Sequence, residues 1–163
     1  MNRLLAGTTR PTKWLFGQAA IIITSSLIAG CTAKPAPKIT VPVTAADYYE
    51  LAKQSEQSGD YTKATKNYDE AVYLKPDFAE AHYKLGQIYG RAGNSRRAIA
   101  AYEDAIKYKP DYVEVHHDLG LLYMRLRNPE DALNCFREVV RIKPEDADAH
   151  YWLGGALIMS GQA

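Results

Sequence analysis

Three histidines recur at one fixed interval, and their type and spacing are the first feature of this chain that suggests chemistry. They are His82, His116 and His150, and imidazole nitrogens are common metal ligands. If the interval marks a repeated helical unit, equivalent positions on neighbouring helices lie about 8 to 10 Å apart, whereas a ligating nitrogen lies about 2 Å from its ion. We therefore predict no shared metal and interpret the histidines as packing residues. His117, beside His116, does not change this prediction.

No other set of residues has the spacing of an active site. The sequence has no serine in a nucleophile-elbow motif, no glycine-rich phosphate loop and no pair of histidines one helical turn apart. Cys135 has no basic neighbour closer than Arg137, so we expect a small, partly buried side chain and not a reactive thiol. We expect a noncatalytic protein without a cofactor. Its acidic residues should lie on solvated helix faces or in turns, among them Glu103, Asp104, Glu145, Asp146 and Asp148.

The interval between the histidines extends far beyond them, because segments 45–78, 79–112 and 113–146 follow one frame. A unit of this length cannot bury its own apolar face, so neighbouring units must stack to form a continuous core. The recurring positions are Tyr48, Leu51, Ala64, Tyr68, Ala71 and Pro76 in the first unit, His82, Leu85, Gly86, Tyr89, Ala98, Tyr102, Ala105 and Pro110 in the second, and His116, Leu119, Gly120, Tyr123, Ala132, Phe136, Val139 and Pro144 in the third.

This pattern resembles the tetratricopeptide repeat, a helix-turn-helix unit with a W-x2-L-G-x2-Y, A-x3-F, A and P signature. The resemblance implies an all-α fold, a right-handed superhelical solenoid of antiparallel helix pairs. It gives three full repeats at 45–78, 79–112 and 113–146, followed by the first helix of a partial fourth repeat at 147–163. The histidines then occupy the place of the consensus tryptophan.

Small residues and turn residues predict how each helix pair is built. We expect Gly86 and Gly120 on first helices to face Ala98 and Ala132 on second helices, so that the two axes approach closely. The proline near the end of each unit should stop the second helix. Glycines at 59 and 93 suit the left-handed turn between paired helices. The third unit has Arg127 there, and we expect it to solve this turn differently, through the Asn128-Pro129 start of its second helix.

The N-terminal segment has the layout of an export signal. Basic residues precede a mostly apolar stretch at 14–28, and small residues follow. The sequence Leu-Ile-Ala-Gly-Cys at 27–31 resembles the bacterial lipobox, which implies a lipoprotein signal peptide at 1–30 and lipidation of Cys31. The alternative is an uncleaved anchor helix. A membrane-spanning helix needs about 20 apolar residues, and Gly17 and Gln18 interrupt this stretch.

The segment that follows, residues 31–44, is a proline-rich linker. An extended linker of this kind would hold the repeats away from a lipid surface, and the multiple acyl chains of a lipidated cysteine would hold the protein firmly on the membrane. Thr32 stands where an aspartate commonly retains lipoproteins in the inner membrane. The resemblance therefore implies the bacterial cell envelope, with the outer membrane facing the periplasm favoured.

The charge of the mature chain argues against nucleic acid as a partner. The segment 1–30 contains three of the 20 basic residues and none of the 19 acidic ones, which leaves a formal charge of −2. Nucleic-acid-binding proteins need a basic face. We therefore expect a protein or peptide as the partner, in addition to the membrane.

The resemblance places the binding surface on the concave face, which the first helices line. A ladder of rings recurs there at position 5 of each unit. Such side chains suit peptide binding, but they can equally pack between adjacent helices, and the sequence leaves both roles open. Acidic Glu114 and Asp118 stand where relatives that bind chaperone tails need bases, which excludes that clamp. The predicted contact residues are Tyr49, Lys53, Tyr83, Gln87, Arg91, His117, Leu121, Met124, Arg125 and Tyr151.

The final helix, expected at 147–160, carries apolar residues around much of its circumference, including Trp152, Leu157, Ile158 and Met159. Either a partner covers this surface, or a second copy covers it by self-association, or the repeat array continues. The sequence predicts a membrane-tethered adaptor that helps to assemble an envelope complex, as pilotins or adaptors of cell-wall enzymes do. The alternative function is an accessory subunit of an envelope enzyme with a bound small ligand or metal.

Overall fold

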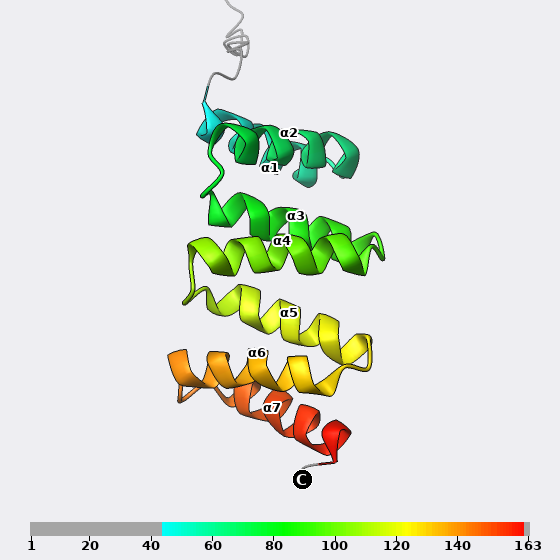
Figure 1. Ribbon diagram of the computed structural model, residues 1–163. Coiled ribbons are helices and arrows are strands. Elements are labelled where there is room, and N and C mark those ends of the chain that lie inside the picture. Colours follow the sequence, from blue (N-terminus) through cyan, green and yellow to red (C-terminus); the bar gives the residue numbers. More distant parts are fainter. Residues whose placement is uncertain (1–43, 162–163) are drawn as a thin grey trace, which may run out of the picture. The chain divides into compact units, whose positions relative to one another are not determined.

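The computed structural model describes residues 44–161, and within this range the chain forms α-helices and no strand. Antiparallel helix pairs stack one on another, and the last helix packs against the third pair (Figure 1). The predicted all-α solenoid is confirmed, with three complete helix pairs and one additional helix. The helices are α1 (Ala45–Gln57), α2 (Tyr61–Leu74), α3 (Ala79–Arg91), α4 (Ser95–Tyr108), α5 (Val113–Arg125), α6 (Pro129–Ile142) and α7 (Ala147–Ser160).

Local sequence signals explain where the helices begin and end. Thr44 and Asp47 form a reciprocal capping box at the start of α1. Side chains of Asp60 and Asn94 accept hydrogen bonds from the first turns of α2 and α4, which satisfies donors that a helix start leaves free. Each second helix ends two residues before a proline, at Leu74, Tyr108 and Ile142.

The turns inside the three helix pairs share one backbone conformation. Gly59 and Gly93 have φ values of 80° and 76°, in the left-handed region that glycine tolerates. Arg127 takes the same conformation, with φ of 57°. The expectation that the third unit solves this turn differently was wrong. Its cap and proline start the next helix, but they do not relieve the arginine backbone, which bears the cost of a left-handed residue with a Cβ.

The glycines of the first helices make room for aromatic rings and not for the small residues that we expected. A Cβ atom built on Gly86 would lie 2.5 Å from the ring of Tyr102, and one on Gly120 would lie 2.8 Å from the ring of Phe136. Gly90 is the glycine that faces Ala98, because a Cβ atom built on Gly90 would lie 3.9 Å from the Cβ of Ala98. The helices do approach closely, but the space that glycine provides is filled by the large residue of the partner helix.

The three histidines make one repeated contact that the sequence analysis missed. Nε2 of His82, His116 and His150 donates to the carbonyl oxygens of Pro76, Pro110 and Pro144, at 2.8, 2.7 and 2.8 Å. A carbonyl can only accept, so Nε2 carries the proton in each case. Each bond ties the start of a first helix to the turn before it. The histidines therefore fix the connection between repeats.

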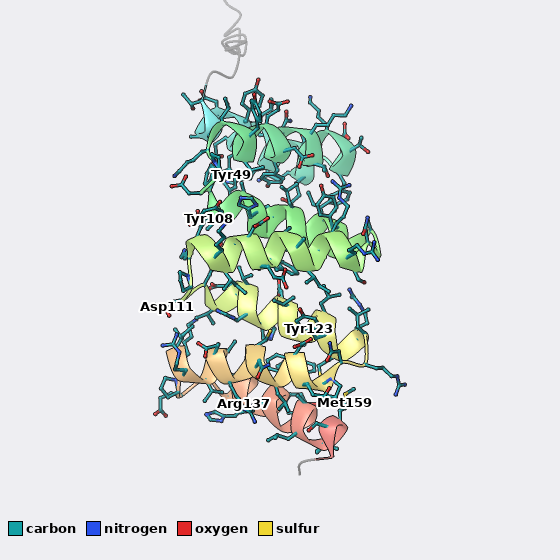
Figure 2. The ribbon with its side chains drawn as sticks, in the orientation of Figure 1. Tyr49, Tyr108, Asp111, Tyr123, Arg137 and Met159 are labelled. Carbon is teal, nitrogen blue, oxygen red and sulfur yellow. The ribbon has the colours of Figure 1, made fainter. Side chains whose placement is uncertain are left out.

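The terminal helix α7 is partly packed and partly exposed. Trp152 and Leu157 pack against a cluster that contains Leu133 and Phe136. Tyr151 and Ile158 are both 70% exposed, and Met159, labelled in Figure 2, is 43% exposed. The expected apolar surface is therefore smaller than the sequence suggested, because two of its four named residues lie against the preceding repeat.

Nothing in the described part of the chain has the length and apolar character of a membrane-crossing helix. The predicted signal peptide, Cys31 and the linker up to residue 43 lie outside the described residues.

Candidate protein-binding groove

The ring ladder at position 5 packs between repeats. Tyr49 lies 5.4 Å from Tyr68 and 4.9 Å from Phe78, measured between ring centroids. Tyr83 has the corresponding neighbours one repeat later, Tyr102 at 6.1 Å and Tyr112 at 5.2 Å. Each ring therefore bridges the second helix of its own repeat and the start of the next repeat. These contacts fix the spacing of the helices that line the concave face.

The later members of the ladder differ from the tyrosines. His117 lies edge-on to Phe136 and Trp152, at 6.2 and 6.5 Å between ring centroids. Tyr151 contacts the ring of Trp152 and is otherwise largely in solvent. The ladder thus becomes less buried toward α7.

A hydrogen-bonded group joins α3 to α5 beneath the concave surface. The Tyr83 hydroxyl donates to Oδ2 of Asp118 at 2.9 Å. Nε2 of Gln87 donates to the same Oδ2 at 3.1 Å and to the Tyr83 hydroxyl oxygen at 2.7 Å. One carboxylate oxygen thus accepts two hydrogen bonds, and together they link the two first helices. Asp118, noted in the sequence only as an obstacle to a chaperone clamp, is therefore a central residue of the groove.

A hollow of about 280 Å³ lies on this group, between α3 and α5. Four of the predicted contact residues line it, namely Gln87, Arg91, Leu121 and Arg125. The remaining lining residues were not predicted, and they are Gly90, Tyr102, Asp118 and Leu122. Tyr102 was missed because it occupies a consensus core position, which hides the fact that its polar end reaches the surface. The hollow combines two guanidinium groups, one carboxylate and a small apolar wall.

A second hollow of about 330 Å³ lies one repeat earlier and includes the predicted residue Lys53. Arg91 lines both hollows, so the two are consecutive sections of one groove. The other lining residues of the second hollow are Glu56, Gln57, Tyr61 and Lys84. The structure thus brings five of the ten predicted residues to two adjoining hollows. Met124 instead packs in the cluster around Phe136, and the ladder rings lie outside both linings.

Burial raises the pKa values of two tyrosines near the first hollow and of the one cysteine among the described residues. Burial is the main cause that raises the pKa of Tyr102, with a further rise from Asp118 and opposing effects of Arg125 and Arg91. The pKa of Tyr83 is raised by burial and by its hydrogen bond to Asp118. Both phenols therefore remain hydrogen-bond donors at any physiological pH. Burial also raises the pKa of the Cys135 thiol to about 12, which makes it unreactive.

Among residues 44–161, no group of three histidine, cysteine or acidic side chains could hold a metal ion. The evenly spaced histidines each use Nε2 for a proline carbonyl. Nε2 of each histidine is therefore occupied in the connection between repeats.

The stacked helix pairs and their groove define an α-solenoid repeat protein. A family model described as TPR repeat matches residues 57–93 and 94–126, and a second, described as Tetratricopeptide repeat, matches residues 117–163. Together they span well over half of the chain. The chain belongs to the tetratricopeptide repeat family.

Solved structures of other repeat proteins are similar in fold. A crystal structure of MamA protein is 25% identical and gives a TM-score of 0.67 over 72% of this chain and 64% of its own. MamA from Desulfovibrio magneticus gives 23% identity and the same TM-score, over 72% of this chain and 67% of its own. The first TPR of Spaghetti, bound to an HSP90 peptide, is 17% identical and gives a TM-score of 0.67 over 72% of this chain and 94% of its own.

YrrB, described as a TPR protein with an unusual peptide-binding site, is 24% identical with a TM-score of 0.66, over 72% of this chain and 60% of its own. The chain spans just under two thirds of the first MamA structure and of YrrB. A comparison with curated proteins gives no match.

Proposed function

We propose that this protein is a noncatalytic adaptor that binds a protein partner in the groove on its first helices. The observation that carries the proposal is the pair of adjoining hollows, which share Arg91 and combine fixed polar groups with an apolar wall. A groove built on packed helices is preorganised, so a partner segment loses its own conformational entropy but does not have to order the protein. Two similar structures, YrrB and the first TPR of Spaghetti, are described with peptide sites or peptides, which agrees with this proposal.

We further propose that the adaptor is anchored in a bacterial envelope membrane through a lipid on Cys31, with the repeats facing the periplasm from the outer membrane. The support is the arrangement of residues 1–31, where a basic leader and an apolar stretch precede Leu-Ile-Ala-Gly-Cys. The proline-rich linker would let the groove meet its partner above the lipid. In this place the adaptor would help to assemble an envelope complex.

Partner recovery after crosslinking on native membranes tests the groove. Arg125→Glu reverses a charge at the wall of the first hollow, whereas Arg137→Glu makes the same change at an exposed residue of α6, labelled in Figure 2. We expect partner recovery to fall at least about tenfold for Arg125→Glu and to stay unchanged for Arg137→Glu. Equal recovery by both variants would place the binding surface elsewhere.

The anchor has a separate test. Cys31→Ser removes the sulfur that would carry the lipid, so incorporation of labelled fatty acid should fall to background. Labelling that persists in this variant would contradict lipidation at Cys31.

A further inference from the structure

The junction between the first two repeats contains the side-chain carboxylate of Glu56. The Tyr68 hydroxyl donates to Oε2 of Glu56 at 3.0 Å. Nζ of Lys84 lies 3.6 Å from the same carboxylate, and Nη1 of Arg91 lies 3.8 Å from its other oxygen. The Glu56 side chain is 16% exposed. One phenol and two cations thus surround a carboxylate on the floor of the groove.

The next junction repeats this frame without the carboxylate. One repeat later in the sequence, a glycine occupies the position equivalent to Glu56. The equivalents of Tyr68 and Arg91 are again a tyrosine and an arginine, and the equivalent of Lys84 is an aspartate. The four equivalent residues are Gly90, Tyr102, Asp118 and Arg125. All four line the 280 Å³ hollow. The space that Glu56 fills at the first junction is therefore open at the second.

The Tyr102 hydroxyl is a second feature that distinguishes this junction from the first. The residue is only 5% exposed, yet in the part of the chain that the structure describes its hydroxyl has no hydrogen-bond partner. The hydroxyl lies 3.9 Å from the position that a Cβ on Gly90 would take. The ring of Tyr102 is buried, but its hydroxyl opens into the hollow, where it can donate a hydrogen bond to a group bound there. At the first junction the equivalent Tyr68 gives its proton to a carboxylate.

The charges at the second junction favour an anion. Arg125 pairs with no carboxylate of the described residues, and both Arg125 and Arg91 act electrostatically on the Tyr102 phenol. Asp118 is the opposing charge, but its Oδ2 already accepts from Tyr83 and Gln87. Its other oxygen lies 3.4 Å from Nδ1 of His117. Arg125, together with Arg91 that also pairs with Glu56, therefore lines the hollow beside one carboxylate whose Oδ2 already has two donors.

We propose that the hollow between α3 and α5 binds a carboxylate from an acidic side chain of the partner, which takes the place that Glu56 occupies one repeat earlier. The carboxylate accepts from the Tyr102 hydroxyl and pairs with Arg125 and Arg91. Leu121 and Leu122 form the apolar wall beside it, suited to the methylene groups of a glutamate. This inference rests on the proposed function, because it specifies the partner of the same groove. It predicts a partner segment in which one aspartate or glutamate is essential.

Gly90 provides a matched pair of variants. A side chain there begins at ordinary van der Waals distance from its neighbours, so it can be accommodated. Gly90→Glu supplies the missing carboxylate from within and should block the site, whereas Gly90→Gln adds the same bulk without the charge.

The whole chain, purified in detergent, is used to select binders from a displayed library of random peptides, and the selected peptides are synthesised with amidated C-termini for affinity measurement.

We expect the wild-type chain to select peptides that share an acidic residue, and glutamine at that residue should weaken binding at least about tenfold. Gly90→Glu should weaken binding about tenfold or more relative to Gly90→Gln, and Tyr102→Phe should weaken it severalfold without lowering the melting temperature.

Selected peptides that need no acidic residue, or that bind the two Gly90 variants equally, would overturn the inference while the proposed groove stands. Binding that needs a free C-terminus would assign the site to a terminal carboxylate and overturn the side-chain assignment. If the wild-type chain selects no peptide, both the inference and the proposed function fail.

Discussion

The junction between the second and third repeats and the junction between the third repeat and α7 have equivalent helices, but the first of these is polar and open and the other is apolar and closed. The junction between the second and third repeats is an open, charged hollow around Tyr102 and Arg125. The junction with α7 is closed by apolar groups, because the rings of Phe136 and Trp152 stack at 6.4 Å and Met124 packs beside them. Phe136 stands one repeat after Tyr102, and Met124 one repeat after Gly90.

The comparison separates what the repeat dictates from what individual residues add. The frame repeats equivalent positions at each junction, and the residue types at these positions decide whether the junction is filled or open. Where they are apolar, the junction contributes to stability. Where a glycine replaces a larger residue beside a phenol, the junction stays open. The predictions below test this division.

The largest effect should come from emptying the closed junction. Phe136 is fully buried, and Phe136→Ala should reduce the free energy of unfolding by about 3 to 5 kcal/mol, through lost burial and the cavity left behind. Chemical denaturation measures this directly. A loss below about 1 kcal/mol would show that this junction is not tightly packed.

The two buried phenols form a matched pair for the open and occupied junctions. Tyr68→Phe removes the donor to a charged carboxylate and should cost about 1.5 to 3 kcal/mol. Tyr102→Phe removes a hydroxyl with no protein partner among the described residues, so the unfolding free energy should change by less than about 0.5 kcal/mol. Equal losses in the two variants would mean that Tyr102 has a hydrogen-bond partner within the protein, as Tyr68 has.

Two glycines on α3 should respond in opposite directions. Gly86→Ala places a methyl group against the ring of Tyr102 and should destabilise the fold by about 1 to 3 kcal/mol. Gly90→Ala finds only ordinary contacts, and the better helix propensity of alanine should stabilise by about 0.5 to 1 kcal/mol. Melting curves of the two variants distinguish a filled glycine site from an open one. The same sign for both would contradict the distinction.

A further effect concerns the turn before the closed junction. Arg127 has a left-handed backbone, and Arg127→Gly should raise the free energy of unfolding by about 1 kcal/mol, because glycine adopts this conformation without steric cost. Gly93→Ala, at the equivalent turn of the second repeat, is the reciprocal control and should destabilise. No gain for Arg127→Gly would mean that contacts of the arginine side chain compensate for its backbone.

Much of the fold could be predicted because the repeat spacing constrains it. The consensus small residues, prolines and aromatic residues are enough to identify helix pairs that must stack. The turn at Arg127 was misjudged because residue preference says how often a conformation occurs, whereas stacking against neighbouring repeats can impose it. The sequence analysis placed Gly86 opposite Ala98, whereas the structure places it against the ring of Tyr102. The sequence does not give the rotation of one helix about its axis relative to another, so this contact could not be predicted.

The groove could be predicted only in part. Gln87, Arg91, Leu121 and Arg125 follow from repeat positions that face inward. Tyr102 could not be identified from its own type, because a consensus core tyrosine gives no sign that its hydroxyl is unpaired. The available signal was the change from Glu56 to Gly90 at equivalent positions, and it has meaning only once the structure shows Glu56 bound to Tyr68.

Site-specific photo-crosslinking in cells tests the central claim most directly, that a protein partner binds in the groove between α3 and α5. A photoreactive amino acid is placed at Gln87, which lines the hollow, and in separate variants at Arg137 and at the exposed Met159. We expect a crosslinked protein from position 87 and none from position 137 or 159. Crosslinks from position 137 or 159, with none from position 87 in a folded variant, would contradict the claim.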